Sequence, residues 1–334
     1  MREFGKPLVI EEVPVPRPAA GDILVKIEAC GVCHTDLHAA EGDWPVKPNP
    51  PFIPGHEGVG HVAAVGAGVT RVKEGDRVGV PWLYTACGCC EHCLTGWETL
   101  CESQQNTGYS INGGYAEYVL ADPNFVGILP KNIEFAEIAP ILCAGITTYS
   151  PLKHYGVKPG DKVGILGMGG LGHMGIKFAK ALGAEVTLFT RSASKAEEGR
   201  RQGADHVIVS TDAEQMRAAA GRFDLLLDTI PVQHDLNPYL DTLRFDGVHI
   251  LVGLIEPVDP PVHAGKLVMS RRVLAGSLIG GIAETQEVLD FCAEHNITCD
   301  IEMLDIRQIN EAYARMIAGD VKYRFVIDMA TLKV

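Results

Sequence analysis

The segment 161–183, DKVGILGMGGLGHMGIKFAKALG, restricts the fold of this chain more than any other. Its apolar run KVGIL has the length of a buried strand, and GLGHMGIKFAKALG carries apolar residues at helical spacing. Glycines separate the two patterns, so the chain turns directly from strand to helix. A strand, a glycine turn and a helix in this order predict a βαβ unit of a parallel sheet.

The same alternation continues along the chain. AEVTLFT, HVIVS, FDLLLDT and GVHILVGL resemble buried strands, and SASKAEEGRRQG between the first two resembles a helix. Strands that alternate with helices predict a parallel sheet covered on both faces. We therefore expect residues 148–279 to form a Rossmann domain, that is, a doubly wound α/β fold that binds a dinucleotide.

The first part of the chain has a different pattern. The runs LVIEEV, ILVKIEA, GVGHVAAVG and DRVGVPW are short and β-branched, and Pro, Gly or Asp closes each of them. They predict a mostly antiparallel, partly barrel-like β domain. After Gly280 we expect helices near 285–295 and 309–319 and a final strand YRFVIDM that packs back on this domain. The predicted catalytic domain is therefore split into residues 1–147 and 280–334.

Composition excludes several classes of protein. The 334 residues exceed what one core usually supports, so two domains that share a cleft are expected. A net charge of −13 argues against nucleic acid or an anionic membrane as partner and favours a small neutral substrate. The start MREFGKPLVIEEV lacks the features of a secretory signal, and no apolar run is long enough for a membrane span. A cytoplasmic protein is expected.

The strongest local motif is CGCCEHCLTGWETLC, in which Cys87, Cys90, Cys93 and Cys101 follow one another at intervals of three, three and eight residues. Four thiolates on one loop complete a tetrahedral shell for zinc, so this site should be structural. The alternative is four free or disulfide-bonded cysteines. Cys89 falls outside the spacing and is expected to be a spectator, although the sequence does not exclude it as a substitute ligand.

A second candidate set is scattered along the chain: Cys33 in GVCHTDLH, His56 and Glu57 in PGHEGVG, and Cys143 in ILCAGITTY. Taken singly, a cysteine beside an apolar run such as Cys143 is more often a core residue. In combination, two thiolates, an imidazole and a carboxylate can hold zinc with a labile position for an alcohol oxygen. Zinc there would act as a Lewis acid.

GVCHTDLH, GHEGVG, the four-cysteine loop and GMGGLG, in this order and spacing, resemble the zinc-dependent medium-chain alcohol dehydrogenases over essentially the whole chain. The resemblance implies a GroES-like catalytic domain, two zinc ions per subunit and reversible oxidation of primary alcohols to aldehydes. It assigns the catalytic zinc to Cys33, His56 and Cys143, with Glu57 as an alternate or neighbouring carboxylate. Asp36 resembles the carboxylate that orients the histidine ligand.

The resemblance also assigns residues to proton transfer and to the substrate. Thr35 would take the alcohol proton, and His38 would pass it to solvent through the nicotinamide ribose. The alternative for His38 is a solvated surface histidine. Trp44 and Trp82 occupy positions that line the substrate pocket in this family and would narrow it toward small or flat alcohols. As ordinary core residues they would need no such explanation.

The glycine turn is the expected cofactor site. Gly167 permits the turn, Gly169 lets the backbone approach the pyrophosphate, and Gly172 lets the helix pack on the strand, with Gly170 and Leu171 completing the motif. The phosphates would sit at the helix N-terminus. The alternative is a glycine turn in a domain that binds no dinucleotide. By resemblance, other residues on both domains approach the cofactor: His34, Thr147, Val252, Ser277, Ile279 and Arg324.

The next strand ends where an Asp or Glu would hold the ribose of NAD. This chain has Thr190 there, followed by Arg191, Ser192 and Lys195. The exchange removes a negative charge and supplies cations, which predicts a preference for NADP. A solvated basic turn on an NAD enzyme is the alternative.

The two halves resemble different branches of the family. Residues up to about 149 are similar to the bacterial tetrameric alcohol dehydrogenases, and the continuation is similar to the NADP-linked cinnamyl alcohol dehydrogenases. A homotetramer is therefore expected, and the chain is either a natural intermediate or a domain exchange. Two rival functions stay open: a polyol or formaldehyde-adduct dehydrogenase, and a zinc- and dinucleotide-binding protein without turnover. The preferred alcohol and the direction of the reaction are also open.

Overall fold

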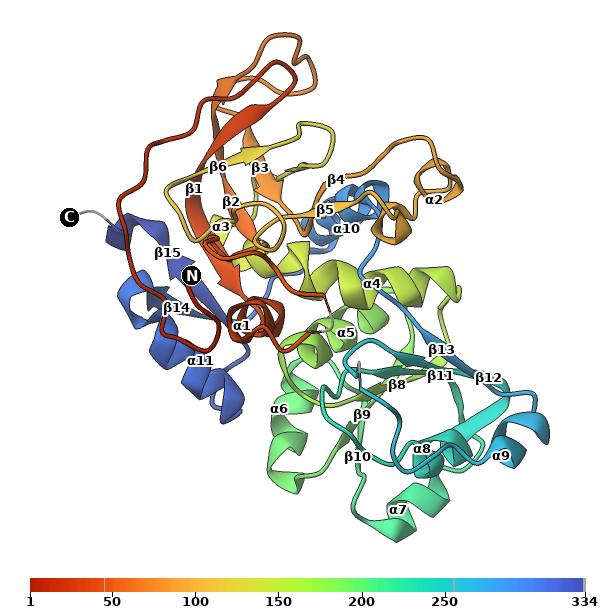
Figure 1. Ribbon diagram of the computed structural model, residues 1–334. Helices are drawn as coiled ribbons and strands as arrows, with labels where there is room; N and C mark the ends of the chain where they lie inside the picture. Colours follow the sequence, from red (N-terminus) through yellow and green to blue (C-terminus); the bar gives the residue numbers. More distant parts are fainter. Residues whose placement is uncertain (45, 255, 333–334) are drawn as a thin grey trace. The chain divides into compact units, whose positions relative to one another are not determined.

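The computed structural model describes residues 1–44, 46–254 and 256–332. The chain forms two compact units (Figure 1). Unit 1 comprises Met1–Ile146 and Gly280–Val334, and unit 2 comprises Thr147–Ile279.

Unit 1 is built on a seven-stranded sheet that is mostly antiparallel. Its strand order is β14-β15-β1-β2-β3-β7, and β6 pairs with β1 outside this path. Only the pair β14 and β15 is parallel among these neighbours. The strands are β1 Ile23–Val32, β2 Gly58–Val65, β3 Arg77–Val80, β6 Tyr118–Ala121, β7 Gly127–Ile128, β14 Ile301–Asp305 and β15 Arg324–Asp328, and a separate pair is formed by β4 Leu83–Thr85 and β5 Gln105–Asn106.

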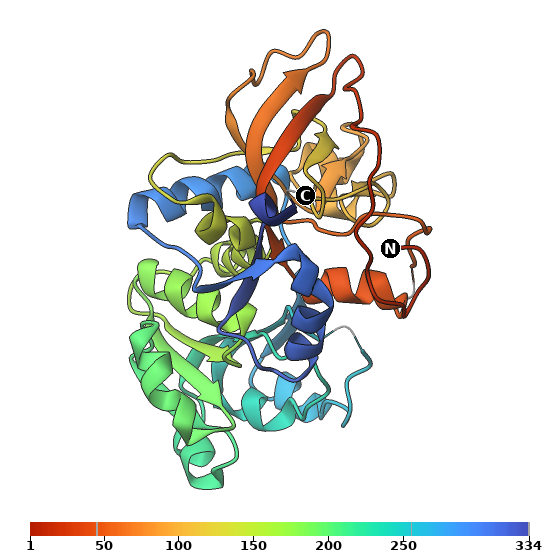
Figure 2. The ribbon, with the colours of Figure 1, turned by 90° about the vertical axis from the view of Figure 1, so that its left-hand side faces the viewer.

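The C-terminal strand lies beside the first strand of the chain. β15 pairs antiparallel with β1 in the register Ala29↔Asp328 to Val32↔Phe325. In Figures 1 and 2 the blue C-terminal segment accordingly lies beside the red N-terminal strand. The two strands share a core that includes Ile23, Ile27 and Ile327. This pairing brings Arg324, the first residue of β15, to the end of β1 that leads into Cys33.

Short helices connect the strands of unit 1. The helix that begins after Cys33 is one of them, and the helix that follows Cys143 crosses the boundary between the units. The helices are α1 His34–Glu41, α2 Glu91–Leu94, η1 Glu98–Leu100, α3 Phe135–Ile138, η2 Ala139–Leu142, α4 Ala144–His154, α10 Ile282–His295, η4 Ile306–Gln308, α11 Ile309–Ile317 and η5 Met329–Leu332.

Unit 2 is a six-stranded parallel sheet of order β10-β9-β8-β11-β12-β13. The order reverses between β8 and β11, and dinucleotides bind at such a switch point, beyond the carboxyl ends of the strands. Because the central strands are buried on both faces, they appear in the sequence as continuous apolar runs. The strands are β8 Lys162–Leu166, β9 Glu185–Thr190, β10 His206–Val209, β11 Phe223–Asp228, β12 Leu243–Leu251 and β13 Val273–Gly276.

Helices connect these strands, as a doubly wound sheet requires. Right-handed crossovers that leave the switch point in opposite directions place their helices on opposite faces. In the part of the chain that the structure describes, no helix is long and apolar enough to cross a bilayer. The helices of unit 2 are α5 Gly170–Ala181, η3 Ala193–Lys195, α6 Ala196–Arg201, α7 Ala213–Ala218, α8 Asn237–Thr242 and α9 Ala264–Val268.

Two local expectations from the sequence are corrected. LVIEEV, at residues 8–13, forms no strand, and the side chain of Asn310 bonds the backbone of Leu8 at both N–H and C=O, at 2.8 and 3.0 Å. The helix expected over SASKAEEGRRQG is divided into the turn η3 and the short helix α6. The motif GVCHTDLH, whose conformation the apolar pattern left open, begins helix α1.

Candidate metal centres and dinucleotide site

The first cluster of potential metal ligands lies in unit 1. Cys33 follows β1 and precedes α1, His56 and Glu57 immediately precede β2, and Cys143 lies between η2 and α4. One ligand atom from each of these four residues lies within 4.8 Å of the others. Residues that are up to 110 positions apart in sequence are thus brought to one point.

The donor atoms of this cluster fit a zinc ion. The sulfurs of Cys33 and Cys143 are 3.9 Å apart, and two thiolates on a tetrahedral zinc lie about 3.8 Å apart. Nε2 of His56 and Oε2 of Glu57 are buried and make no hydrogen bond to any described residue. Buried polar atoms without partners are rare in proteins, so these two donors require a ligand such as a cation.

Asp36 organises the cluster from the first turn of α1. Its Oδ1 accepts bonds from Nδ1 of His56 at 2.9 Å and from the Gly55 N–H at 3.0 Å, and its Oδ2 accepts from the Cys33 N–H at 3.0 Å. Burial alone would lower the pKa of His56, but the Asp36 carboxylate raises it well above its ordinary value. Because Asp36 holds a proton on Nδ1, a metal would bind His56 at Nε2 and displace the second proton, which the raised pKa otherwise keeps there.

Tyr115 is a fourth partner of Asp36, with its hydroxyl 3.3 Å from Oδ2. Gly55 has φ +101°, and a Cβ at this position would lie 2.5 Å from the Tyr115 ring. The glycine of PGHEGVG is therefore required both by its backbone conformation and by this ring. Nothing in the sequence pattern indicated Tyr115, because it reaches Asp36 only through the tertiary fold.

Glu57 forms a buried ion pair with Arg324 of β15. Desolvation raises the pKa of Glu57 to about 7, against the opposing effect of the Arg324 guanidinium. The resemblance assigned Arg324 to the cofactor pyrophosphate. The structure places its guanidinium against Glu57, and a role in cofactor binding stays a prediction.

Trp44 and Trp82 belong to a row of aromatic rings in unit 1. The Trp82 ring meets the His56 ring edge to face at 5.3 Å, and Tyr109 lies between the two tryptophans at 5.4 Å from Trp82 and 6.1 Å from Trp44. The hydroxyl of Tyr109 donates to the carbonyl of Val46. Tyr109 was not predicted from the sequence, because no spacing links it to the tryptophans.

Thr35 and His38 lie on the same short helix as Asp36. The Thr35 hydroxyl is 3.7 Å from the sulfur of Cys33. His38 is half-buried, stacks on Trp44 with 5.3 Å between centroids, and has Nδ1 3.0 Å from the Asp43 carboxylate. Asp43, which the sequence analysis did not select, therefore fixes the orientation of the His38 ring.

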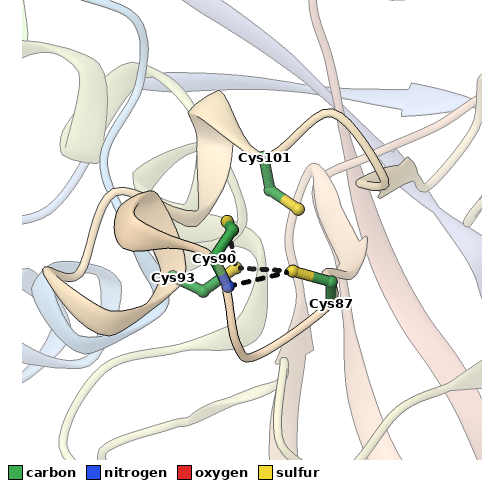
Figure 3. A group of neighbouring side chains, drawn as sticks. All are labelled: Cys87, Cys90, Cys93 and Cys101. Atoms are coloured by element: carbon green, nitrogen blue, oxygen red, sulfur yellow. Dashed lines mark hydrogen bonds between the residues drawn. The ribbon is translucent and has the colours of Figure 1, made fainter.

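The second cluster is the four-cysteine loop between β4 and β5 (Figure 3). Its ligand sulfurs lie within 4.8 Å of one another, with 3.8 Å between Cys87 and Cys93 and 3.5 Å between Cys90 and Cys93. Backbone N–H groups of Cys89 and Cys90 lower the pKa of Cys87 to about 6, which favours the thiolate that a metal binds. The sulfur of Cys101 completes the group in Figure 3.

Cys89 is exposed and contacts this cluster from outside. Its sulfur lies 3.7 Å from that of Cys87. The Cys89 sulfur is not one of the four sulfurs that all lie within 4.8 Å of one another. Among the residues that the structure describes, no disulfide competes with the two clusters for their cysteines.

The glycine turn of unit 2 joins β8 to α5. Gly167 has φ +92°, and Gly172 packs so closely on the Gly167 carbonyl that no Cβ would fit. A Cβ on Gly169, in contrast, would meet no atom within 4 Å. The backbone at Gly169 therefore faces open space at the N-terminus of α5, where amide N–H groups can bind phosphate.

The basic turn follows β9 at the same edge of the sheet. Thr190 is buried, and its hydroxyl accepts a bond from the Ser192 N–H at 3.3 Å. Arg191, Ser192 and Lys195 are exposed. Within the described residues neither Arg191 nor Lys195 makes an ion pair, so both cations are available to an anionic ligand.

The remaining predicted cofactor residues are distributed over both units. Val252 and Ser277 follow β12 and β13, and their N–H groups donate to Asp228 and Leu251 at the carboxyl edge of the sheet. Ile279 has φ +49°. Thr147, in unit 2, is buried, and His34, in unit 1, is exposed.

Comparison with known proteins identifies the family. The alcohol dehydrogenase GroES-like domain matches residues 19–131, and the zinc-binding dehydrogenase domain matches residues 170–294. An alcohol dehydrogenase of Rhizobium meliloti is 50% identical over 332 residues, which cover 98% of this chain and 97% of that protein.

Solved structures agree with this assignment. A cinnamyl alcohol dehydrogenase of Sorghum bicolor matches with a TM-score of 0.90 and 39% sequence identity. The match covers 95% of this chain and 93% of the Sorghum bicolor chain. The CAD of Helicobacter pylori, solved in complex with NADP(H), matches with a TM-score of 0.86 and 37% sequence identity. The match covers 94% of this chain and 92% of the Helicobacter pylori chain. The chain is a member of the zinc-dependent medium-chain alcohol dehydrogenase family, an NAD(P)-dependent enzyme that interconverts alcohols and aldehydes.

Proposed function

We propose that this enzyme oxidises small or flat primary alcohols reversibly, with zinc at the Cys33 cluster and NADP as preferred cofactor. The observation that carries the proposal is the convergence of four donor atoms from Cys33, His56, Glu57 and Cys143 within 4.8 Å of one another. Two of these donors are buried without another hydrogen-bond partner among the described residues. The second zinc of each subunit would be structural and bound by the four-cysteine loop.

Cys33, His56 and Cys143 would hold the catalytic zinc, which when bound polarises the substrate oxygen as a Lewis acid. Asp36 keeps the proton of His56 on Nδ1 and so leaves Nε2 as donor. Glu57, paired with Arg324, supplies the fourth donor, a carboxylate oxygen that can exchange with water or substrate. Thr35 would accept the alcohol proton, and His38 would move it toward solvent.

The aromatic row sets the proposed substrate class. Trp82 lies edge-on to the His56 ring, and Tyr109 and Trp44 extend the row away from it. Flat rings at this position favour unbranched or aromatic alcohols, because an aromatic substrate can stack and a branched polar one loses its hydration. Benzyl alcohol is therefore the first substrate to test.

The test measures zinc content together with cofactor-dependent oxidation of benzyl alcohol and a panel of alcohols, polyols and aldehydes. The expected result is turnover of benzyl alcohol with two zinc ions per chain. A protein that binds zinc and cofactor without turnover of any member of the panel would contradict the proposal. Preferential turnover of polyols would instead support the polyol dehydrogenase alternative.

We expect His38→Ala to lower kcat at neutral pH about tenfold or more, a modest share of what general acid–base catalysis contributes. The loss should shrink at high pH, because hydroxide and buffer bases can then accept the proton directly. The matched control is His61→Ala, which removes a half-exposed histidine of β2 that pairs with Glu28. Loss of zinc from the His38 variant would show that His38 is a ligand and not a relay.

The proposed assembly is a homotetramer. Apart from the resemblance to tetrameric relatives, β13 is the terminal strand of the unit 2 sheet, and edge strands are usually covered in proteins. Exposed apolar residues lie on or near it: Val268, Met269, Val273 and Leu278. Sedimentation should give about four times the 35.9 kDa of one chain. A mass near that of the monomer would contradict the proposal.

A further inference from the structure

Unit 2 contains a cluster of two buried titratable residues and one partly exposed one that the proposed mechanism does not use. Asp228 ends β11 and His249 lies in β12, and both are fully buried. His234 lies in residues 229–236, which connect β11 to α8 and are called the β11–α8 loop here. Oδ2 of Asp228 accepts from Nε2 of His234 at 2.9 Å and from Nε2 of His249 at 2.8 Å. One carboxylate oxygen thus joins the loop to the core.

Both ring nitrogens of His234 face acceptors. Nε2 faces the Asp228 carboxylate, and Nδ1 lies 2.8 Å from the carbonyl oxygen of Val232. A carbonyl and an ionised carboxylate cannot donate, so both bonds form only when both nitrogens carry protons. The observed geometry of His234 is therefore that of an imidazolium.

His249 has a different requirement. Its Nε2 donates to Asp228, and its Nδ1 makes no hydrogen bond to any described residue. A proton on Nε2 is enough to make the hydrogen bond from His249 to Asp228, and a second proton on Nδ1 would meet no acceptor among the described residues. Of the two histidines, only His234 gains a hydrogen bond from carrying a second proton.

The charges around His234 favour its protonation. The titratable groups that face it are Asp228 of β11, Asp235 of the loop and Tyr239 of α8, whose ring lies 6.0 Å away, with His249 of β12 behind Asp228. Burial alone would lower the pKa of His234, but Asp228, and Asp235 to a smaller extent, raise it. Burial would raise the pKa of Asp228, and the two histidines keep it below its ordinary value.

The β11–α8 loop begins directly against the glycine turn. Thr229 donates to the carbonyl of Leu166 from its N–H at 3.1 Å and from its hydroxyl at 2.7 Å. A Cβ on Gly167 would lie 3.1 Å from the Thr229 hydroxyl and 3.3 Å from Ile230. The loop and the glycine turn follow β11 and β8, the two strands that flank the switch point.

The two ends of this loop are held differently. Thr229 and Ile230 are fixed by bonds to Leu166 and to Oδ1 of Asp228. Farther along, the side chain of His234 connects the Val232 carbonyl to Asp228. A neutral His234 could keep only one of its two bonds, because the nitrogen without a proton would face another acceptor.

We propose that the His234 imidazolium positions the β11–α8 loop for dinucleotide binding, so that cofactor affinity falls when His234 loses its proton. The inference rests on the proposed use of the glycine turn as the dinucleotide site. Because the folded protein favours protonation of His234, the contribution of the imidazolium to cofactor affinity is complete at low pH. This contribution is lost as pH rises through the pKa of His234. By linkage, bound cofactor must favour the protonated form equally.

The test measures the Kd of NADH by fluorescence titration from about pH 6 to about pH 9, a range that brackets ordinary histidine titration. NADH is the probe because it lacks a 2′-phosphate that would titrate itself. The zinc-loaded full-length enzyme is compared with His234→Gln and His234→Asn, two neutral variants that can each retain one of the two bonds. We expect the ratio of variant to parent Kd to fall from about ten at low pH to about one at high pH, since one hydrogen bond to a charged group is lost.

The matched control is His206→Gln, which removes an exposed histidine of unit 2 that pairs with Glu185 at 3.0 Å. Its Kd ratio should stay near one at every pH. A Kd ratio for both His234 variants that is the same at low and high pH would show a structural role only and would overturn the proposal. Failure of the parent to bind both NADH and NADPH would overturn the dinucleotide site itself, and the two failures are therefore distinguishable.

Discussion

Cys33→Ala should abolish turnover while leaving the fold intact, whereas Cys101→Ala should destabilise the fold. A Lewis-acid metal contributes several kcal/mol to the transition state, so the loss for Cys33→Ala is about 1000-fold or more in kcat/KM. Cys101 is buried in the four-cysteine loop, whose metal would hold η1 to α2. Cys101→Ala should lower the Tm by about 10 °C, the shift that a loss of roughly 3 kcal/mol in the free energy of unfolding causes in a domain of this size.

The measurement is zinc per chain, kcat/KM and Tm for the parent and both variants. Zinc should fall from two per chain to one in each variant. Cys33→Ala should lose activity and keep its stability, whereas Cys101→Ala should lose stability. Cys292→Ala is the matched control, because Cys292 is buried but belongs to neither cluster. Cys89→Ser tests the exposed neighbour and should change none of the three quantities. One zinc per chain in a fully active parent would contradict the two-site proposal.

The sequence predicted unit 2 better than the first part of unit 1, for a physical reason. A strand buried on both faces is a continuous apolar run, and in GMGGLG the positive φ of Gly167 and the close packing of Gly172 each require a glycine. LVIEEV at residues 8–13 has the same composition as a strand, yet the side chain of Asn310 bonds its backbone in place of a neighbouring strand. A contact across 302 positions leaves no pattern in the local sequence.

In the candidate site too, residues that belong to a local motif were predicted, and residues that meet only through distant contacts were not. Cys33 and Asp36 are three positions apart in GVCHTDLH, and the four-cysteine loop is contiguous, so local motifs identified them. Tyr109 joins the aromatic row only through the tertiary fold, and Tyr115 contacts Asp36 in the same way. His234 was missed for a related reason, because its significance lies in two acceptors that the fold places on opposite sides of its ring.

The enzyme should prefer NADP over NAD by about 30-fold to 1000-fold in kcat/KM. An Asp at position 190 would bond a free 2′-hydroxyl and repel a phosphate, whereas Thr190 does neither strongly. Arg191 offers a fork of donors to a phosphate, Ser192 offers a hydroxyl, and Lys195 offers a point charge. Hydrogen bonds to charged groups contribute roughly 1.5 to 3 kcal/mol each, and exposure reduces this. A net preference of roughly 2 to 4 kcal/mol corresponds to the stated range.

The test compares kcat/KM for both cofactors in the parent and in Thr190→Asp combined with Arg191→Ile, which should reverse or abolish the preference. Arg217→Ile is the matched control, because it removes an exposed cation of unit 2 that belongs to α7 and not to the turn after β9. It should leave the ratio unchanged, since a general change in charge would affect both cofactors alike. If the parent favours NAD, or if the double variant leaves the ratio where it was, Arg191 and Lys195 form only a solvated basic turn. The cofactor preference would then be wrong, while the assignment of the Cys33 cluster would be unaffected.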